Sequence, residues 1–374
     1  MCYNIYVRLG KKVLKMRERK TVGMVLGCFA PLHKGHMELI LKAKKENDLC
    51  YVIVCGYNGD KGEPLLPLRK RVRYVNETFR NDELVKVISV NDTELGIDQS
   101  MSKSNWGTWL ACVLNQLEDN GDDKLIRTWY VGEPRYVDDL ANWNENAILV
   151  NRQTLPISAT KIRNNPMKYW NYISPVFRKV YSHNILITGT ASEGKTTLTR
   201  DIAKLFGLPH SEEMGRTRIE ATAKRDNELD FGDFHYNLYE QNNENAKNID
   251  GLSNQGIIIS DTDNLVTLMY AKMYAEEPDF DLTYEDYEAL YKLAKHQSKY
   301  IKWNKIFVLA PKGEFVDDGV RYMGHGDMET REKLFKSLIE LLDDFGYEYE
   351  ILKGGYLNNY LRVKEYVEGV MDYE

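Results

Sequence analysis

The sequence predicts an α/β protein of two domains, each built on a parallel β-sheet. The chain has 374 residues, which exceeds one typical hydrophobic core and suits two domains of roughly 100–200 residues each. Hydrophobic residues make up 43% and charged residues 28%, values near the globular average that exclude wholesale disorder, collagen-like and coiled-coil architectures. Short apolar segments alternate with helix-like segments, and this order occurs twice along the chain.

Net charge, cysteine content and hydropathy indicate which partners and which location to expect. The 50 Lys and Arg residues and 56 Asp and Glu residues give a net charge of −6, which predicts no nucleic-acid partner and requires a local positive site for any anionic ligand. The five cysteines are odd in number and lack C-x-x-C spacing, so we expect reduced thiols and a cytoplasmic location. No apolar run reaches the ~20 residues of a membrane span, so the chain is not predicted to be membrane-embedded.

The first predicted domain covers residues 21–165 and follows a basic arm over residues 1–20. Its strands are short, apolar and β-branched, as expected for a buried parallel sheet, and are predicted at 21–26, 51–55, 85–90, 128–131 and 147–150. The segments between them have helical spacing of apolar residues, and helices are predicted at 37–45, 69–79, 106–117 and 137–143.

The loop after the first strand reads G-C-F-A-P-L-H-K-G-H over residues 27–36. This is the position where an α/β sheet binds a nucleotide, outside the carboxyl end of a strand. His33 and His36 stand at a helix N-terminus, where imidazoles can donate to phosphate oxygens, and Gly35 permits close backbone approach. We expect both histidines to be catalytic and Gly27, Phe29 and Gly35 to bind nucleotide. The alternative is a surface histidine pair without function.

A second element, I-S-A-T-K-I-R over residues 157–163, opens another helix. It places the Ser158 hydroxyl and the Arg163 guanidinium at a positive helix N-terminus. We expect Ser158 and Thr160 to bind nucleotide and Arg163 to act with the histidines. The alternative is an ordinary Ser N-cap. A nucleotidyl transfer needs charge neutralisation and in-line placement, which these residue types supply.

Residues 166–182 form a predicted connector, and residues 183–374 form the second domain. The connector carries Trp170, Tyr172 and Phe177, so we expect it to be packed rather than flexible. In the second domain, strands are predicted at 184–188, 256–260 and 306–309, and helices at 196–206, 234–249, 284–298, 329–345 and 357–370.

The sequence G-T-A-S-E-G-K-T over residues 189–196 fits the P-loop pattern directly between a strand and a helix. Backbone N–H groups of such a loop surround phosphates, while Lys195 neutralises β- and γ-phosphate charge and Thr196 holds Mg²⁺. The alternative is a glycine-rich turn. The expected nucleotide-binding residues are Gly189, Ser192, Gly194, Thr196 and Thr197, with Lys195 catalytic.

An acidic element follows the apolar strand at 256–260. Asp261 and Asp263 are both predicted to be catalytic, one through Mg²⁺ and one by accepting a proton from a substrate hydroxyl, and the division of roles stays open. The metal site is predicted at Thr196 and Asp261. The alternative for Asp263 is a cap of the helix that begins near Asn264.

Four further residues are candidates in the second domain. Arg321 and Arg331 could reach the transferring phosphates from a closing lid, the alternative being a surface ion pair. Glu213 and Arg216 follow the first helix of this domain, and they could bind a substrate hydroxyl and a phosphate or ring.

Taken in order, these motifs resemble the NadR family, bifunctional nicotinamide-nucleotide adenylyltransferases and ribosylnicotinamide kinases. The resemblance covers about residues 21–374 and includes K-Y-W at 168–170, E-M-G-R at 213–216 and D-D-G-V-R at 317–321. It implies a Rossmann-like nucleotidyltransferase sheet followed by a P-loop kinase sheet. It also implies nicotinamide riboside, nicotinamide mononucleotide, ATP and NAD as ligands, Mg²⁺ as cofactor, and leaves coupling to a riboside transporter and homo-oligomerisation as open partnerships.

The sequence departs from the family in places. Some members begin with a helix-turn-helix domain, which residues 1–20 are too few to form, so DNA-bound repression is not expected. M-G at 214–215 and the turn at 132–136 match the family loosely. A flat nicotinamide ring offers a face for stacking, and we expect Trp106 to supply the aromatic partner.

Two rival interpretations remain. A fused phosphopantetheine adenylyltransferase and dephospho-coenzyme A kinase would also join an H-x-G-H domain to a P-loop. The other rival is an NAD sensor in which one domain binds nucleotide without turnover and contacts a transporter or repressor. The catalytic motifs in both domains count against the sensor.

Overall fold

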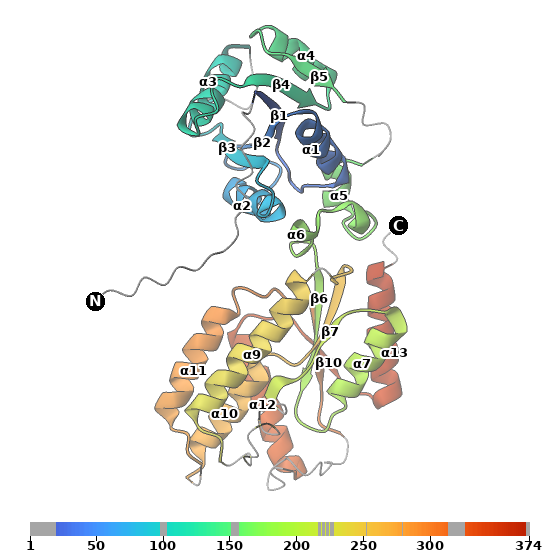
Figure 1. Ribbon diagram of the computed structural model, residues 1–374. Coiled ribbons are helices and arrows are strands. Elements are labelled where there is room, and N and C mark those ends of the chain that lie inside the picture. Colours follow the sequence, from blue (N-terminus) through green and yellow to red (C-terminus); the bar gives the residue numbers. More distant parts are fainter. Residues whose placement is uncertain are drawn as a thin grey trace, which may run out of the picture. The chain divides into compact units, whose positions relative to one another are not determined.

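The protein is described by a computed structural model (Figure 1). It describes residues 20–97, 103–150, 157–215, 228–251, 253–278, 280–312 and 326–371, together with residues 218, 221 and 224. The chain divides into two compact units between Ala159 and Thr160. The predicted first domain ends six residues later, at 165, and the predicted connector lies within the second unit.

The first unit is a parallel sheet with helices on both faces. Its strands lie in the order β3-β2-β1-β4-β5, and β1 is the point where the order reverses. The elements are β1 Thr21–Gly27, α1 Lys34–Glu46, β2 Leu49–Gly56, α2 Leu68–Phe79, β3 Val85–Asn91, α3 Lys103–Asp119, β4 Ile126–Val131, α4 Pro134–Ala141 and β5 Ala147–Leu149. Helix α5, Ala159–Asn164, begins at the division between the units.

Alternation along β1 explains how this sheet is covered. Val22 and Met24 pack into a core with the α3 residues Trp109 and Val113. Gly23 points to the other face, where a Cβ atom would lie 2.8 Å from the carbonyl oxygen of Ala43 in α1. Since successive side chains of a strand face opposite sides, α3 and α1 cover the two faces of the same strand.

The second unit repeats this plan with a second parallel sheet, in the order β10-β9-β6-β8-β7. The connecting elements η1 Trp170–Tyr172 and α6 Pro175–Arg178 precede it. The remaining elements are β6 His183–Gly189, α7 Lys195–Phe206, β7 His210–Ser211, α9 Phe231–Asp250, β8 Ile257–Asp261, α10 Asn264–Glu276, α11 Tyr284–Gln297, β9 Lys305–Leu309, α12 Met328–Asp344, β10 Glu350–Leu352 and α13 Tyr356–Met371.

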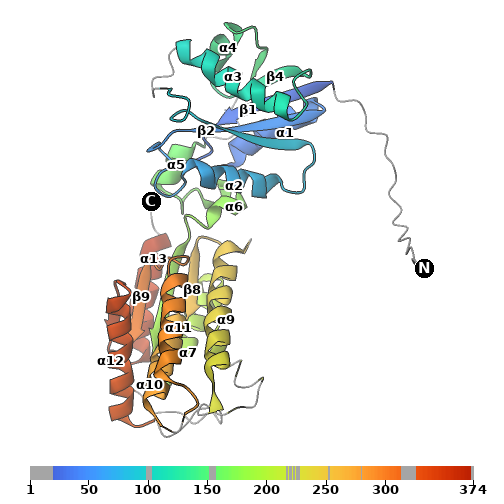
Figure 2. The ribbon, with the colours of Figure 1, turned by 90° about the vertical axis from the view of Figure 1, so that its left-hand side faces the viewer.

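Two cores cover the faces of the second sheet. Leu186 of β6 packs with apolar residues of α9, α10, α11 and α12, whereas Ile185 and Ile187 pack with α7 and α13. Figure 2 shows the helices of the first group standing together along one face of the sheet. The connector is packed as predicted, because Phe177 is fully buried and the Trp170 indole donates to the carbonyl oxygen of Asn254 over 3.1 Å.

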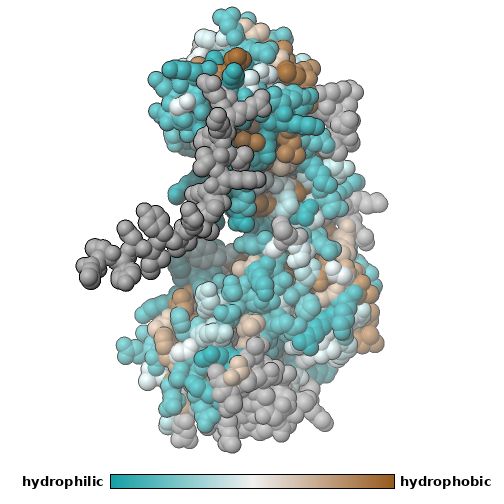
Figure 3. Space-filling view, in the orientation of Figure 1, coloured by the Kyte–Doolittle hydropathy of each residue, from teal (hydrophilic) through white to brown (hydrophobic). Residues whose placement is uncertain are grey.

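The displayed surface is mainly hydrophilic, and the described cysteines form no disulfide bond. Figure 3 shows mainly hydrophilic residues on the displayed face, interrupted by small apolar patches. Among the described residues, no helix combines the length and apolar character that crossing a membrane requires. The described cysteines, Cys28, Cys50, Cys55 and Cys112, are free thiols as predicted.

Candidate active sites

The β1–α1 loop holds two histidine rings against each other. His33 and His36 stack with their ring centroids 3.7 Å apart, and the Phe29 ring lies edge-on to His36 at 5.0 Å. His33 is the N-cap of α1, and its carbonyl oxygen accepts from the His36 N–H over 2.8 Å. His36 therefore lies in the first turn of a helix, where the backbone favours an anion.

Two glycines leave room for these rings. A Cβ atom at Gly27 would lie 3.0 Å from the Phe29 ring, and one at Gly35 would lie 3.3 Å from the His33 ring. Phe29 itself has a left-handed backbone with φ of +48°. The two glycines thus permit the ring arrangement of the loop, a role that the sequence motif did not reveal.

A buried arginine that the sequence analysis missed anchors this loop. Arg71 of α2 is fully buried, and its Nη1 donates to the carbonyl oxygens of Cys28 and Cys55 over 2.9 and 3.2 Å. Its Nη2 donates to Asp60 Oδ2 over 2.5 Å. The basic stretch L-R-K-R-V-R at 68–73 contains three arginines, and no local pattern indicates which one is buried.

The second predicted element of the first site spans the division between the units. Ser158 is exposed and directly precedes α5, as the sequence predicts. Arg163 is half-buried, and its Nη2 donates to the Thr160 hydroxyl over 3.1 Å. The nucleotide-binding roles of Ser158 and Thr160 and the catalytic role of Arg163 stay predictions.

Trp106 occupies a different position from the one expected of a substrate-binding residue. Its side chain is only 3% exposed. The ring lies edge-on to Trp109 at 5.4 Å and to Tyr136 at 6.0 Å, within the core of the first unit. The structure therefore makes Trp106 a core residue, because its apolar surface already packs against other aromatic side chains.

The P-loop connects β6 to α7 with the backbone that its glycines predict. Gly189 has φ of +148°, and a Cβ atom there would lie 2.7 Å from the carbonyl oxygen of Leu309. Gly194 has φ of +81°, in the left-handed region, and is the N-cap of α7. Ser192 also has a left-handed backbone, with φ of +66°. A positive φ favours glycine, which explains the two glycines of the motif at 189 and 194.

Several polar side chains in and next to the P-loop are buried. Lys195 is 6% exposed, and its Nζ donates to the carbonyl oxygen of Thr190 over 2.9 Å. The hydroxyl oxygens of Thr188 and Thr190 are buried and have no hydrogen-bond partner within the described part of the chain. Thr197 is exposed at the start of α7. Buried hydroxyls without a partner among the described residues are consistent with a polar ligand at this loop.

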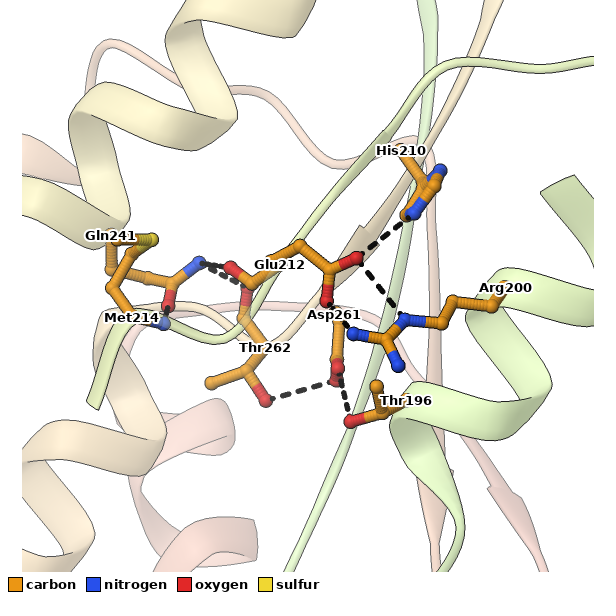
Figure 4. A network of polar contacts seen from close by, with 8 residues as sticks. All are labelled: Thr196, Arg200, His210, Glu212, Met214, Gln241, Asp261 and Thr262. Atoms are coloured by element: carbon orange, nitrogen blue, oxygen red, sulfur yellow. Dashed lines mark hydrogen bonds and ion pairs between the residues drawn. The ribbon is translucent and has the colours of Figure 1, made fainter. Parts of the chain in front are cut away.

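Asp261 ends β8 and contacts the P-loop directly (Figure 4). It is 1% exposed, and the Thr196 hydroxyl donates to its Oδ2 over 2.5 Å. Burial raises the pKa of Asp261 to about 6, and the negative charge of Glu213 adds to this rise, while the charge of Lys195 lowers the pKa. The structure thus brings together four predicted site residues of the second unit.

Asp263 is the N-cap residue of α10. Its side chain caps α10 by accepting from the Leu265 N–H over 3.0 Å, and it also bonds the Trp303 side chain. Burial raises its pKa to about 6 as well. The alternative interpretation of Asp263 as a helix cap is therefore the one that the geometry supports, and Asp261 is the carboxylate next to the P-loop.

Arg331 is buried next to the P-loop rather than extended on a lid. It lies on α12, is 2% exposed, and forms an ion pair with Glu193 of the P-loop. Glu213 is half-buried, and its negative charge raises the pKa of Asp261. The other two candidates, Arg216 and Arg321, lie outside the described residues.

Gln241 of α9, also missed by the sequence analysis, ties two loops of this site together. Its Oε1 accepts from the Met214 N–H over 2.9 Å, and its Nε2 donates to the carbonyl oxygens of Glu212 and Thr262 over 3.1 and 3.4 Å (Figure 4). These bonds join the segment after β7 to the segment after β8, so they hold Glu213 in the neighbourhood of Asp261.

The fold and the two sites define a two-domain enzyme of nucleotide chemistry, with a nucleotidyltransferase-type unit and a P-loop unit. Residues 24–165 match the family model described as cytidylyltransferase-like, and residues 184–358 match the model described as AAA domain. A stretch of 98 residues is 36% identical to the phosphopantetheine adenylyltransferase of Lactococcus lactis subsp. cremoris, which covers 26% of this chain.

The chain belongs to the NadR family. It is 32% identical to a NadR protein solved in complex with NAD and AMP-PNP, over 95% of this chain and 97% of that one, with a TM-score of 0.81. For a NadR protein in complex with NR the identity is 33% over the same shares, with a TM-score of 0.82. The trifunctional NAD biosynthesis/regulator proteins NadR of Escherichia coli and Salmonella typhimurium are 24% and 25% identical, over 95% of this chain and 84% of each relative.

Proposed function

We propose that this enzyme carries out two consecutive steps of NAD salvage. The second unit transfers the γ-phosphoryl group of ATP to nicotinamide riboside, giving nicotinamide mononucleotide. The first unit transfers the adenylyl group of ATP to this mononucleotide, giving NAD and diphosphate. The observation that carries the proposal is the continuous similarity over 95% of the chain to NadR structures solved with NAD and AMP-PNP and with NR. The motifs of both units are present in this chain.

In the second unit, catalysis rests on charge placement around the P-loop. Lys195 neutralises phosphate charge in the transition state, since phosphoryl transfer needs positioning and electrostatic stabilisation more than covalent help. Glu213 binds the acceptor hydroxyl. Arg331 adds positive charge next to the loop, where its guanidinium now pairs with Glu193.

Thr196 and Asp261 would hold Mg²⁺. Their hydroxyl and carboxylate are hard oxygen donors that already bond to each other over 2.5 Å. One carboxylate and one hydroxyl suit Mg²⁺, because it is usually held by one or two carboxylates together with waters and substrate phosphates. Bound there, Mg²⁺ supplies further neutralisation of phosphate charge.

In the first unit, His33 and His36 stabilise the phosphate charge that grows as the adenylyl group is transferred. The helix N-terminus at His36 adds a fixed positive potential. No covalent intermediate is required, because bound ATP and mononucleotide need only in-line placement and charge neutralisation.

The test is to incubate the protein with ATP, Mg²⁺ and nicotinamide riboside and to follow mononucleotide and NAD by chromatography. Both products are expected in sequence. Consumption of phosphopantetheine or dephospho-coenzyme A without use of the riboside would contradict the proposal in favour of the coenzyme A enzyme. Nucleotide binding without any product would favour a sensor.

A further inference from the structure

Helix α9 buries a stripe of polar side chains on one face. Asp233, Asn237, Gln241 and Asn245 follow one another at four-residue spacing, so they share a face of the helix. Their exposed fractions are 1%, 5%, 2% and 1%. Burying a polar side chain is unfavourable unless it finds hydrogen-bond partners.

Three of the four side chains have partners within the protein. Asp233 forms ion pairs with Arg218 and Lys224. Gln241 makes the three loop contacts described above. The Asn245 amide donates to the carbonyl oxygen of Thr262 over 3.3 Å and accepts from the Ser211 hydroxyl over 2.6 Å.

Asn237 differs from the other three. Its Oδ1 is buried and has no hydrogen-bond partner among the residues that the structure describes. Asn237 lies one helical turn, ~5.4 Å along the axis, from Asp233 on one side and from Gln241 on the other. Gln241 contacts Thr262, the residue next to Asp261. The unpaired oxygen therefore lies on the face of α9 that is directed towards the kinase site.

We propose that Asn237 binds the phosphoryl acceptor of the second unit through an N–H or O–H donor of the riboside, and thereby selects the substrate. This inference rests on the proposed kinase function. A riboside bound near Asp261 carries such donors in its ribosyl hydroxyls and its carboxamide. A site that offers a buried acceptor discriminates strongly against analogues without the matching donor, because the acceptor is then left unpaired.

The test compares Asn237→Leu with Gln241→Leu in the full chain. Asn237→Leu should lower kcat/KM for nicotinamide riboside at least about tenfold, the effect of one lost hydrogen bond in a buried site, and leave the KM for ATP unchanged. Its Tm should stay constant or rise, because the replaced oxygen loses no hydrogen-bond partner among the residues that the structure describes. Gln241→Leu, on the same face, should lower the Tm, since the Met214 N–H and the Glu212 carbonyl oxygen lose the Gln241 side chain as hydrogen-bond partner.

A third variant tests recovery and locates the donor. Asn237→Asp keeps an oxygen acceptor, so riboside phosphorylation should recover towards the parent level. If the donor is the carboxamide, Asn237→Asp should reject nicotinate riboside more strongly than the parent does, because two carboxylates would meet. If the donor is a ribosyl hydroxyl, both proteins should show the same preference between the two ribosides.

Two results would overturn the Asn237 assignment alone. One is an unchanged kcat/KM for the riboside in Asn237→Leu, and the other is a fall in Tm as large as that of Gln241→Leu, which would indicate a structural role. A parent protein without riboside kinase activity would overturn the proposed function and this inference together.

Discussion

Asp261→Asn should make the second unit more stable while it removes kinase activity. The pKa of Asp261 rises from 3.8 to about 6 on folding, mainly through burial. The folded state therefore binds the proton more tightly, and stability falls as the pH rises from about 4 to about 6. A shift of about two pKa units corresponds to about 3 kcal/mol of lost stability at neutral pH. The Asn variant carries no charge and keeps an oxygen to accept from Thr196.

Thermal unfolding and kinase assays of the same variant check this reasoning. For a unit of this size, about 3 kcal/mol corresponds to a Tm increase of roughly 6–12 °C at about pH 7.5. The difference in Tm between variant and parent should shrink below about pH 6, because the parent carboxyl is then protonated. Riboside phosphorylation should be lost, since a neutral amide is a poor ligand for Mg²⁺.

Asp263→Asn is the matched control. Asp263 is also buried with a pKa of about 6, but its side chain caps α10, and Asn is an equally good cap. We expect a similar pH-dependent gain in Tm with kinase activity retained. An Asp261→Asn protein that is less stable than the parent at neutral pH, or that keeps full kinase activity, would refute the reasoning.

Three further variants test the remaining roles. Lys195→Ala should abolish mononucleotide formation from riboside, because the β- and γ-phosphates lose their cation, yet it should still convert supplied mononucleotide to NAD; loss of both activities in a folded protein would count against this. His36→Ala should lower the turnover of NAD formation by roughly 10²–10³ and spare the riboside kinase, and normal NAD formation would exclude the role. Arg71→Met should cost about 3–5 kcal/mol in urea unfolding of the first unit, since Asp60 is left buried without its partner; a stable variant would show that Arg71 is dispensable.

Local motifs were predictable from the sequence because glycine positions and helix starts are decided by neighbouring residues. The P-loop glycines Gly189 and Gly194 and the helix N-terminus at the histidine motif follow from spacing alone. By contrast, Arg71 bonds Cys28 across 43 residues, and no periodic pattern records such a contact. The same holds for the partners of Gln241.

Some elements were missed for reasons of length and burial. Strands β7 and β10 have two and three residues, too few for an alternating pattern to be visible. Helix α10 is surrounded by α9, α11 and α12, so apolar residues occur around its circumference and its only clear sequence signal was the cap near Asn264. The structure places Trp106 in the core rather than at a ligand site. The sequence could not distinguish the two, because an aromatic residue at helical spacing occurs in both settings.

Among the described residues, the strands of each sheet pair only with strands of the same unit, so the backbone ladder of each sheet is built within one half of the chain. Peptide continuity at residues 159–160 nevertheless makes every molecule carry one copy of each half. Gene dosage or expression level therefore scales both reaction steps equally. Mutations inside one sheet or its loops can change one step without the other, so natural selection can adjust the two catalysts separately while their ratio stays one to one.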